Sequence, residues 1–243
     1  MASSSGLSPE FPRPRRNPLR TCWGLLAGGL LATLPAFAAL PGYLRTALDS
    51  FNPGMPAGWA CTITTTRNKD TLVERFDPSR PPDGQWTLLQ CHDRTPTAEE
   101  REKYLQSRPP GSTVGPQAVF SKADIEPGSL TLVREDGDRA EFKGSFRTEA
   151  TGADKMLGHL VLYLTANKQR PYVEKYALLL ETPYSPVLGV KMNELQLVAE
   201  FLPPESDRPS LPAKQTSHFT GRILLIPTEE TLQVIFSNFT RSP

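Results

Sequence analysis

A period of two in the positions of apolar residues dominates the second half of the chain and limits what it can fold into. Ala140, Phe142, Gly144 and Phe146 alternate with charged or polar residues in a segment that ends at Glu149. Successive side chains of a strand point to opposite faces of a sheet, so this alternation predicts a strand with one apolar and one wet face. Similar patterns predict strands at residues 129–134, 157–165, 172–180, 190–201, 221–226 and 232–239, with a hairpin turn at 136–138.

The first half predicts a smaller antiparallel meander with a helix on either side of it. Three strand patterns occur there, at residues 59–67, 71–76 and 85–91. Thr97 and Glu100 have the spacing of a capping box, which predicts a helix over 97–107. The apolar positions of Pro41–Phe51 favour a second, short helix. Residues 109–119 are rich in proline, glycine and serine without periodicity, so we expect a long surface loop.

Two of the predicted strands are apolar on both faces. His159–Leu164 and Tyr176–Leu180 are nearly continuous apolar runs, whereas a strand with one wet face should alternate. Something must therefore cover the second face, and only the two helical segments are available. We expect an α+β, mainly β fold, in which a curved antiparallel sheet of about ten strands forms an open half-barrel. One or two helices would pack on its concave face. A closed barrel is the alternative.

The N-terminal residues have the parts of a secretory signal peptide: a basic start, a short apolar stretch and small residues at the cleavage point. Four arginines precede the apolar segment Cys22–Leu34, and Pro35 breaks any helix that follows. We expect cleavage between Ala38 and Ala39, which places residues 39–243 in the periplasm as a single domain. The alternative, a membrane anchor, would need about 20 consecutive apolar residues.

Loss of the signal peptide would leave the chain close to electrical balance. The whole chain has 27 basic and 26 acidic residues, a formal net charge of +1. Because the signal contains four arginines and one glutamate, the exported chain would carry a charge of −2. Nucleic-acid-binding proteins concentrate an excess of basic residues on one face. No such excess exists here, so a nucleic-acid partner is not expected.

Cys61 and Cys91 remain after cleavage and are candidates for a disulfide in an oxidising compartment. A bridge that closes a loop of about 30 residues would stabilise the fold by a few kcal/mol in the loop-entropy model. Two independent buried thiols are the alternative, because free cysteine behaves as a small hydrophobic residue. The sequence leaves both open.

No motif in the sequence indicates catalysis, a metal or a cofactor. The histidines are too scattered to predict a shared metal: His92, His159 and His218. A Gly-x-Ser-x-Gly elbow and a glycine-rich phosphate loop are both missing from the sequence. The carboxylate pairs Glu99-Glu100 and Glu229-Glu230 have the positions of a helix start and a turn. We therefore expect a protein that is not an enzyme.

The remaining functional signal is an excess of apolar residues over what a few thin helices can cover. An apolar concave face is by default a ligand site, although an ordinary packed core is the alternative. If a cavity exists, the inward-facing strand residues are the candidates to line it: Phe142, Phe146, Leu195, Leu197 and Phe201.

Three stretches resemble exported bacterial proteins of the LolA-like and LolB-like lipoprotein-carrier superfamily: Val73–Arg80, Trp86–Leu89 and Pro183–Lys191. The similarity in layout covers most of residues 58–241. It implies an unclosed barrel with an apolar hollow for acyl chains, lidded by helices. The expected function is then a non-enzymatic carrier or sensor of a lipid, lipoprotein acyl chain or other apolar ligand, with transient membrane contact. The alternative is an interaction module of the cell envelope with a filled core and a protein partner at an edge strand.

Overall fold

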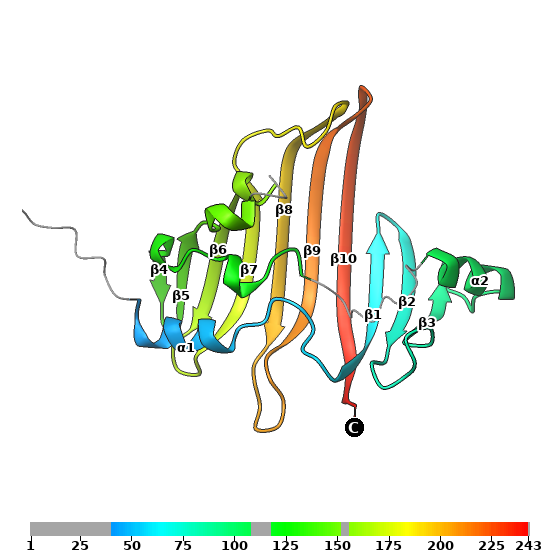
Figure 1. Ribbon diagram of the computed structural model, residues 1–243, viewed down its shortest axis with the longest axis horizontal. Coiled ribbons are helices and arrows are strands. Elements are labelled where there is room, and N and C mark those ends of the chain that lie inside the picture. The colour runs from blue at the N-terminus through cyan, green and yellow to red at the C-terminus, as the bar shows by residue number, and fades with distance from the viewer. Residues whose placement is uncertain (1–39, 108–117, 152–155, 243) are drawn as a thin grey trace, which may run out of the picture. The chain divides into compact units, whose positions relative to one another are not determined.

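The computed structural model describes residues 40–107, 118–151 and 156–242, which belong to one compact unit, Ala38–Pro243 (Figure 1). The predicted signal peptide, its cleavage point between Ala38 and Ala39, and most of the predicted loop at 109–119 lie outside the described residues. Ten strands are present among the described residues: β1 (Trp59–Arg67), β2 (Asp70–Phe76), β3 (Trp86–Cys91), β4 (Thr131–Asp136), β5 (Arg139–Gly144), β6 (Leu160–Asn167), β7 (Tyr172–Leu180), β8 (Val190–Leu202), β9 (Leu211–Ile223) and β10 (Ile226–Arg241).

The ten strands form a single antiparallel sheet in the order β3-β2-β1-β10-β9-β8-β7-β6-β5-β4. The edge strands β3 and β4 do not pair with each other, so the sheet is open and the closed barrel is excluded. The expected fold class, an open antiparallel sheet of ten strands with two helices, is confirmed. The N-terminal meander β1–β2–β3 joins the sheet through β10, the last strand of the chain.

Two α-helices lie in the described ranges: α1 (Gly42–Ser50) and α2 (Ala98–Ser107). At the start of α2 the Glu100 backbone N–H donates to Thr97 Oγ1 at 3.2 Å, and the Glu100 carboxylate accepts from the Thr97 backbone N–H at 2.7 Å. This is the predicted capping box. In the part of the chain that the structure describes, no helix has the length and apolar character that crossing a membrane requires.

Both helices pack on the same face of the sheet, which we call the core face. Residues that pair across neighbouring strands point to the same face. One row of paired residues crosses five strands, from β7 through β8, β9 and β10 to β1: Tyr176, Ala199, Gln215, Val234 and Thr65. α1 contacts β6 and β7, where its buried residues join the hydrophobic cluster that contains Tyr176. The buried residue of α2 joins the cluster on β1–β3.

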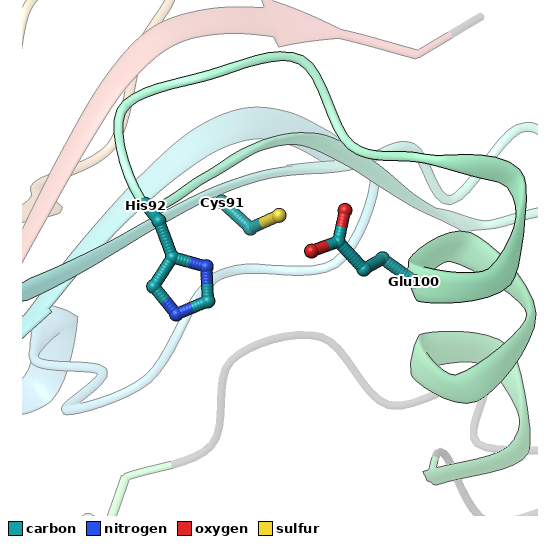
Figure 2. Close-up of side chains that lie close together, drawn as sticks. All are labelled: Cys91, His92 and Glu100. Carbon is teal, nitrogen blue, oxygen red and sulfur yellow. The ribbon is translucent and has the colours of Figure 1, made fainter.

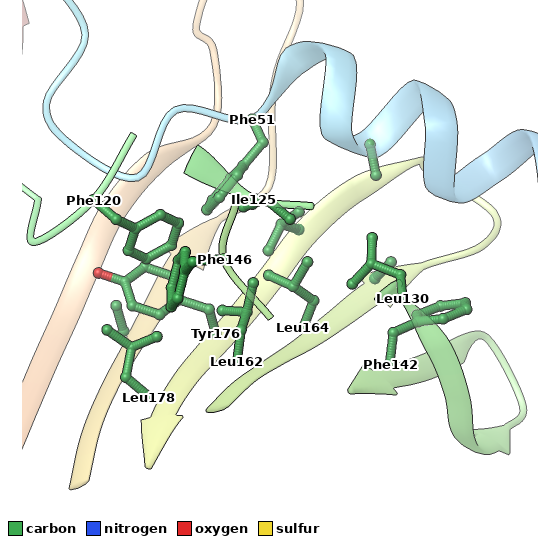
Figure 3. Close-up of a cluster of buried hydrophobic side chains, with 14 of the residues drawn as sticks. Phe51, Phe120, Ile125, Leu130, Phe142, Phe146, Leu162, Leu164, Tyr176 and Leu178 are labelled. Carbon is green, nitrogen blue, oxygen red and sulfur yellow. The ribbon is translucent and has the colours of Figure 1, made fainter. Parts of the chain in front are cut away.

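The core face therefore carries two separate hydrophobic clusters. The first lies on β5–β8 beneath α1, and Figure 3 shows its central side chains, among them Phe51, Phe120, Phe146 and Tyr176. The second, smaller cluster lies on β1–β3 with one residue from β10 and one from α2: Cys61, Ile63, Phe76, Trp86, Leu88, Tyr104 and Phe236. In strand β9, which lies between them, only Leu211, Pro212 and Gly221 are buried, and residues 213–220 are half-buried.

The prediction of one strand over 221–226 is wrong, because residues 221–223 end β9, residues 224–225 form the turn and Ile226 begins β10. Leu224 and Leu225 have φ angles of 49° and 73°, the left-handed conformation of a two-residue hairpin turn. The preceding strand β9 begins ten residues earlier than predicted, at Leu211. The strand predicted over 140–149 ends at Gly144, and a short 3-10 helix occupies Thr148–Thr151 instead.

Both cysteines in the described residues are free and buried, so the second of the two alternatives, independent thiols, holds in this structure. Cys61 lies opposite Phe76 and Cys91 lies opposite Leu72, which is at the far end of the intervening strand β2. With strands about 4.8 Å apart and about 3.4 Å per residue along β2, the two Cα atoms are roughly 16 Å apart. A disulfide requires less than about 7 Å.

Candidate functional site

The five residues predicted to line a cavity are all on the core face or beside it. Four of them are buried in the first hydrophobic cluster, with at most 8% of their surface exposed: Phe142, Phe146, Leu197 and Phe201. Leu195, on β8, is half-buried and packs at the margin of this cluster. The structure thus brings the five residues together on one face, where four contribute to a packed core.

The packing of that core is aromatic and centres on Phe51, directly after α1. Its ring centroid lies 5.5 Å from that of Phe201, 6.2 Å from that of Tyr176 and 6.4 Å from that of Phe120. Phe120 in turn contacts Phe146 edge-on at 5.1 Å (Figure 3). Edge-to-face pairs at these distances are favourable beyond the area that they bury. The segments that flank α1 and β4 therefore fill this half of the core face with the chain's own side chains.

Between the two clusters, the core face is only half-buried over residues 213–220 of β9 and over the adjoining Leu195 of β8 and Leu232 and Val234 of β10. We call this region the central strip and define it by its apolar members: Leu195, Phe219, Leu232 and Val234. Phe219 pairs with Leu195 across β8 and β9, and Ser217 and Gln215 pair with Leu232 and Val234 across β9 and β10. Each of these side chains is half-buried rather than enclosed.

An ion pair lies at the edge of the central strip. Arg67, at the end of β1, pairs with Leu232 in the sheet register, and its Nε lies 3.4 Å from the Glu230 carboxylate. Their side chains are 63% and 39% exposed, so water screens the pair and its contribution to stability is small. The strip therefore combines an apolar surface with a weak, exposed ion pair at one side.

The sequence did not predict Phe219, Leu232 or Val234 as site residues. Phe219 lies in the part of β9 that was not predicted as a strand, so its face could not be assigned. Leu232, Val234 and Phe236 do alternate with polar residues inside the predicted strand 232–239. That period of two is the signal that could have placed Leu232 and Val234 on the core face.

A second cluster of reactive side chains lies where β3 leads to α2. Figure 2 shows Cys91 between His92 and Glu100, with the three side chains converging. Ligand atoms of the three residues lie within 4.8 Å of one another, and thiolate, imidazole and carboxylate are all zinc ligands. From the sequence, Cys91 was predicted only as a disulfide candidate, His92 was one of three scattered histidines, and Glu100 had only the role of a helix start.

The electrostatics of this cluster oppose a cation. Both Glu100 carboxylate oxygens already accept hydrogen bonds from Arg94, at 2.9 and 2.6 Å, and the guanidinium supplies the positive charge. Burial and the neighbouring Glu100 raise the pKa of the Cys91 thiol, which disfavours the thiolate that a metal requires. His92 is exposed in a turn. We interpret the cluster as the anchor that fixes the start of α2.

The anchor predicts a specific dependence of stability on pH. Hydrogen bonds from Arg94 and from the Thr97 backbone lower the pKa of Glu100 well below its ordinary value of 4.5. Because the folded state binds this proton more weakly than the unfolded state, the stabilisation is complete above pH 4.5 and is lost as pH falls below it. Glu100→Gln should therefore weaken the loss of thermal stability between pH 5 and about pH 3.

Glu99→Gln is the matched control, because Glu99 lies beside Glu100 on α2 with its side chain 75% exposed and pairs only with Lys103 in the contacts described. Thermal unfolding followed by circular dichroism at several pH values measures both variants. Glu99→Gln should keep the acid sensitivity of the parent protein. Equal acid sensitivity in the parent and in Glu100→Gln would contradict the anchor.

The other two histidines do not meet an acid in the interactions that the described residues make. The His159 ring stacks on Tyr184, with ring centroids 4.1 Å apart. His218 Nδ1 lies 3.5 Å from Thr231 Oγ1 on the exposed part of β9 and β10. Neither arrangement provides the base and orienting carboxylate of a nucleophilic enzyme.

A groove of about 390 Å³ lies at the β4–β8 end of the sheet, and its lining is mostly charged. Arg139 Nε lies 2.6 Å from the Glu174 carboxylate, and Arg134 Nε lies 3.9 Å from that of Glu141. Opposite charges within the groove thus neutralise one another. This lining suits neither an apolar ligand nor an ion of one sign, so the groove is a weaker candidate than the central strip.

Comparison with known proteins identifies no family. No family model and no curated protein matches the chain. Two variants of the GphF dehydratase are weakly similar among solved structures, each with 12% sequence identity. The first covers 80% of this chain and 81% of its own with a TM-score of 0.15, and the second covers 82% and 80% with a TM-score of 0.13. Scores this low carry no argument about fold or activity.

Proposed function

We propose that this chain is a non-enzymatic, extracytoplasmic binding protein that holds an amphiphilic ligand along the central strip. One observation carries the proposal: the core face is packed at both ends but only half-buried between them, over β9 and the adjoining residues of β8 and β10. These are also the longest strands, with 13, 13 and 16 residues. A concave or exposed apolar surface of this kind is the usual place for an apolar ligand.

The two faces of β10 differ in a way that supports the choice of face. On the core face Leu232 and Val234 are half-buried, whereas on the opposite face Ile235 is 40% exposed and Thr231 is exposed. Among the described residues, Val234 packs at the margin of the second cluster and Leu232 belongs to neither cluster, so this part of the core face is only partly shielded from water. A flexible apolar chain lying there would gain more burial than it could on the opposite face.

The strip favours an amphiphile over a purely apolar molecule. Ser217 and Gln215 stand among its apolar residues and offer hydrogen bonds. The exposed Arg67–Glu230 pair lies beside Leu232, so a headgroup can replace one weak partner at small cost. We therefore propose an acyl chain along Phe219, Leu232 and Val234, with its polar group near Arg67.

Phe219→Gln is expected to weaken binding of a fluorescent fatty acid by roughly 10- to 100-fold. The reason is that it removes about 1.5–3 kcal/mol of binding free energy from burial of the apolar side chain. Ile235→Gln is the matched control, because it makes a similar apolar-to-polar change on the opposite face of β10. It should leave the affinity within a factor of two. Titration of fluorescence, together with displacement by unlabelled fatty acid, measures both.

Two outcomes would contradict the proposal. One is the same loss of affinity in Phe219→Gln and Ile235→Gln, which would place the probe elsewhere. The other is no saturable uptake of fatty acid by the unaltered protein. Thermal unfolding of each variant is measured in parallel, so that a folded protein is compared in every case.

The second candidate function is an interaction module with a protein partner at a sheet edge. It is favoured by β4, an edge strand whose six residues are all exposed. Leu132 and Val133 are each 53% exposed, and the unpaired edge of such a strand can accept another strand. Crosslinking in envelope extract distinguishes the two functions: a stoichiometric protein partner without bound amphiphile would favour the module.

A further inference from the structure

The hairpin between β9 and β10 and the loop before β8 end in a group of exposed apolar side chains. We call this group the apolar tip and define it by six residues, whose exposed fractions range from 44% to 102%: Val187, Leu188, Ile223, Leu224, Leu225 and Ile226. They account for six of the twelve large apolar side chains found exposed among the described residues. Scattered exposed leucines are ordinary, but a contiguous apolar surface usually marks an interaction site.

The two segments of the tip are joined into one surface. The Leu224 backbone N–H donates to the Gly189 carbonyl at 2.8 Å, which ties the hairpin turn to the loop. Val190, the first residue of β8, pairs with Ile223 of β9, and Ile223 pairs with Ile226 of β10. Three adjacent strands therefore present their apolar ends together.

The turn itself is made of residues that are poor choices for its backbone. A two-residue hairpin turn with positive φ at both positions favours Asn-Gly, because left-handed conformations are unfavourable for residues with large side chains. Here the two positions are Leu224 and Leu225, with 74% and 87% of their surface exposed. Neither side chain is buried in a core. Such a departure from local preference points to a role outside the fold.

Charge around the tip has one sign near its base. Residues 182–190 and 223–228 contain no charged side chain. The first charged residues behind the tip on β8 and β9 are Lys191 and Arg222, which lie directly opposite each other. The nearest acidic residues on these strands and β10 are farther from it, at Glu194 and Glu229. An apolar end with two basic residues at its base, Lys191 and Arg222 (the basic pair), complements a membrane surface with anionic headgroups.

We propose that the apolar tip docks the protein on anionic membranes by inserting Leu188, Leu224 and Leu225 among the lipids. Lys191 and Arg222 then lie at the level of the headgroups. This inference does not depend on the proposed ligand site, because the tip and the central strip share no defining residue.

The test uses protein in the form its own host produces, mixed with vesicles of phosphatidylcholine containing 30% phosphatidylglycerol. We expect Leu224→Asn combined with Leu225→Gly to reduce sedimentation with these vesicles at least tenfold. Because Asn-Gly suits the turn, the variant should unfold at the same temperature as the parent or higher. Leu132→Asn combined with Val133→Thr, on β4, is the control that removes equally exposed apolar residues elsewhere, and it should bind as the parent does.

The basic pair Lys191 and Arg222 should determine the preference for anionic lipids. Lys191→Gln combined with Arg222→Gln should remove the preference for phosphatidylglycerol vesicles over pure phosphatidylcholine, and salt should have less effect on this variant than on the parent. Hydrogen exchange at residues 222–228 should slow when vesicles are added to the parent protein, because insertion shields the turn.

The proposal is overturned if the turn variant binds vesicles as the parent does, or if vesicles leave hydrogen exchange at 222–228 unchanged. It is also overturned if the parent binds no vesicles but self-associates through the tip, with a sedimentation coefficient that the turn variant lowers. Fatty-acid uptake should be unaffected by the turn variant. Failure of the tip proposal is therefore distinguishable from failure of the ligand proposal.

Discussion

Replacing Phe51 with alanine is expected to lower the free energy of unfolding by about 3–5 kcal/mol, among the largest effects that a single substitution in this chain can have. Phe51 is 5% exposed and its ring contacts those of Phe120, Tyr176 and Phe201. It is also the residue that ends α1, so its removal leaves a cavity and loosens the helix from β6 and β7. For a domain of this size the melting temperature should fall by about 10 °C.

Denaturant unfolding followed by circular dichroism measures this change. Leu105→Ala on α2 is the control, because Leu105 is 51% exposed and should cost less than about 0.5 kcal/mol. Phe51→Leu should lie between the two. A loss of stability in Phe51→Ala no greater than in Leu105→Ala would mean that the aromatic cluster does not hold α1 on the sheet.

Gly221→Ala is the second substitution with a large expected effect. A Cβ atom on Gly221 would lie 2.3 Å from the Lys191 carbonyl oxygen, an atom of the neighbouring backbone that cannot rotate away. β8 and β9 must therefore separate at this point. The Phe219 ring, which also approaches this position at 2.6 Å, must move as well. We expect a loss of about 3 kcal/mol, at the upper end of the usual cost of overpacking.

Two other glycines give a graded comparison within the same chain. At Gly144 the added Cβ would meet the Leu130 side chain at 2.6 Å, and that side chain can yield, so Gly144→Ala should cost less than Gly221→Ala. At Gly42, in α1, it would meet nothing within 4 Å, and alanine's helix propensity makes a neutral or stabilising effect the expected result. A different order of the three melting temperatures would contradict the packing described for β8 and β9.

The elements that the sequence predicted correctly are those whose local signals agree with their final environment. The capping box at Thr97 and Glu100 fixed the start of α2, and its two hydrogen bonds are present. The alternation of Trp59, Cys61 and Ile63 with threonines predicted β1 with both of its bounds. In these segments local propensity and burial lead to the same structure.

Strand β9 was predicted at the wrong place because its environment hides the usual signal. Residues 213–220 are half-buried on both faces, and only Ala213 and Phe219 among them are apolar, so no period of two appears. The run from Ile223 to Ile226 has the composition of a buried strand, yet Leu224 and Leu225 form an exposed turn. Sequence patterns assume that apolar residues seek the core, and the apolar tip does not follow that rule.

The predicted cavity residues share a face, as expected, but the sequence could not reveal what covers them. Helix α1 and Phe120 cover Phe142, Phe146 and Phe201. Phe120 directly follows residues 109–119, whose sequence has no periodicity. Loop residues carry no signal of the face on which they will pack. The central strip was missed for the complementary reason, since among the residues that the structure describes no such cover lies over it between the two packed clusters.

The most direct test of the proposed function is native mass spectrometry of the protein purified from its own host. The central strip predicts a bound amphiphile of defined mass in near-stoichiometric amount, retained in Ile235→Gln and lost in Phe219→Gln. Repeated isolation of the unaltered protein at the mass of the polypeptide alone would contradict the account. So would an amphiphile that both variants retain equally.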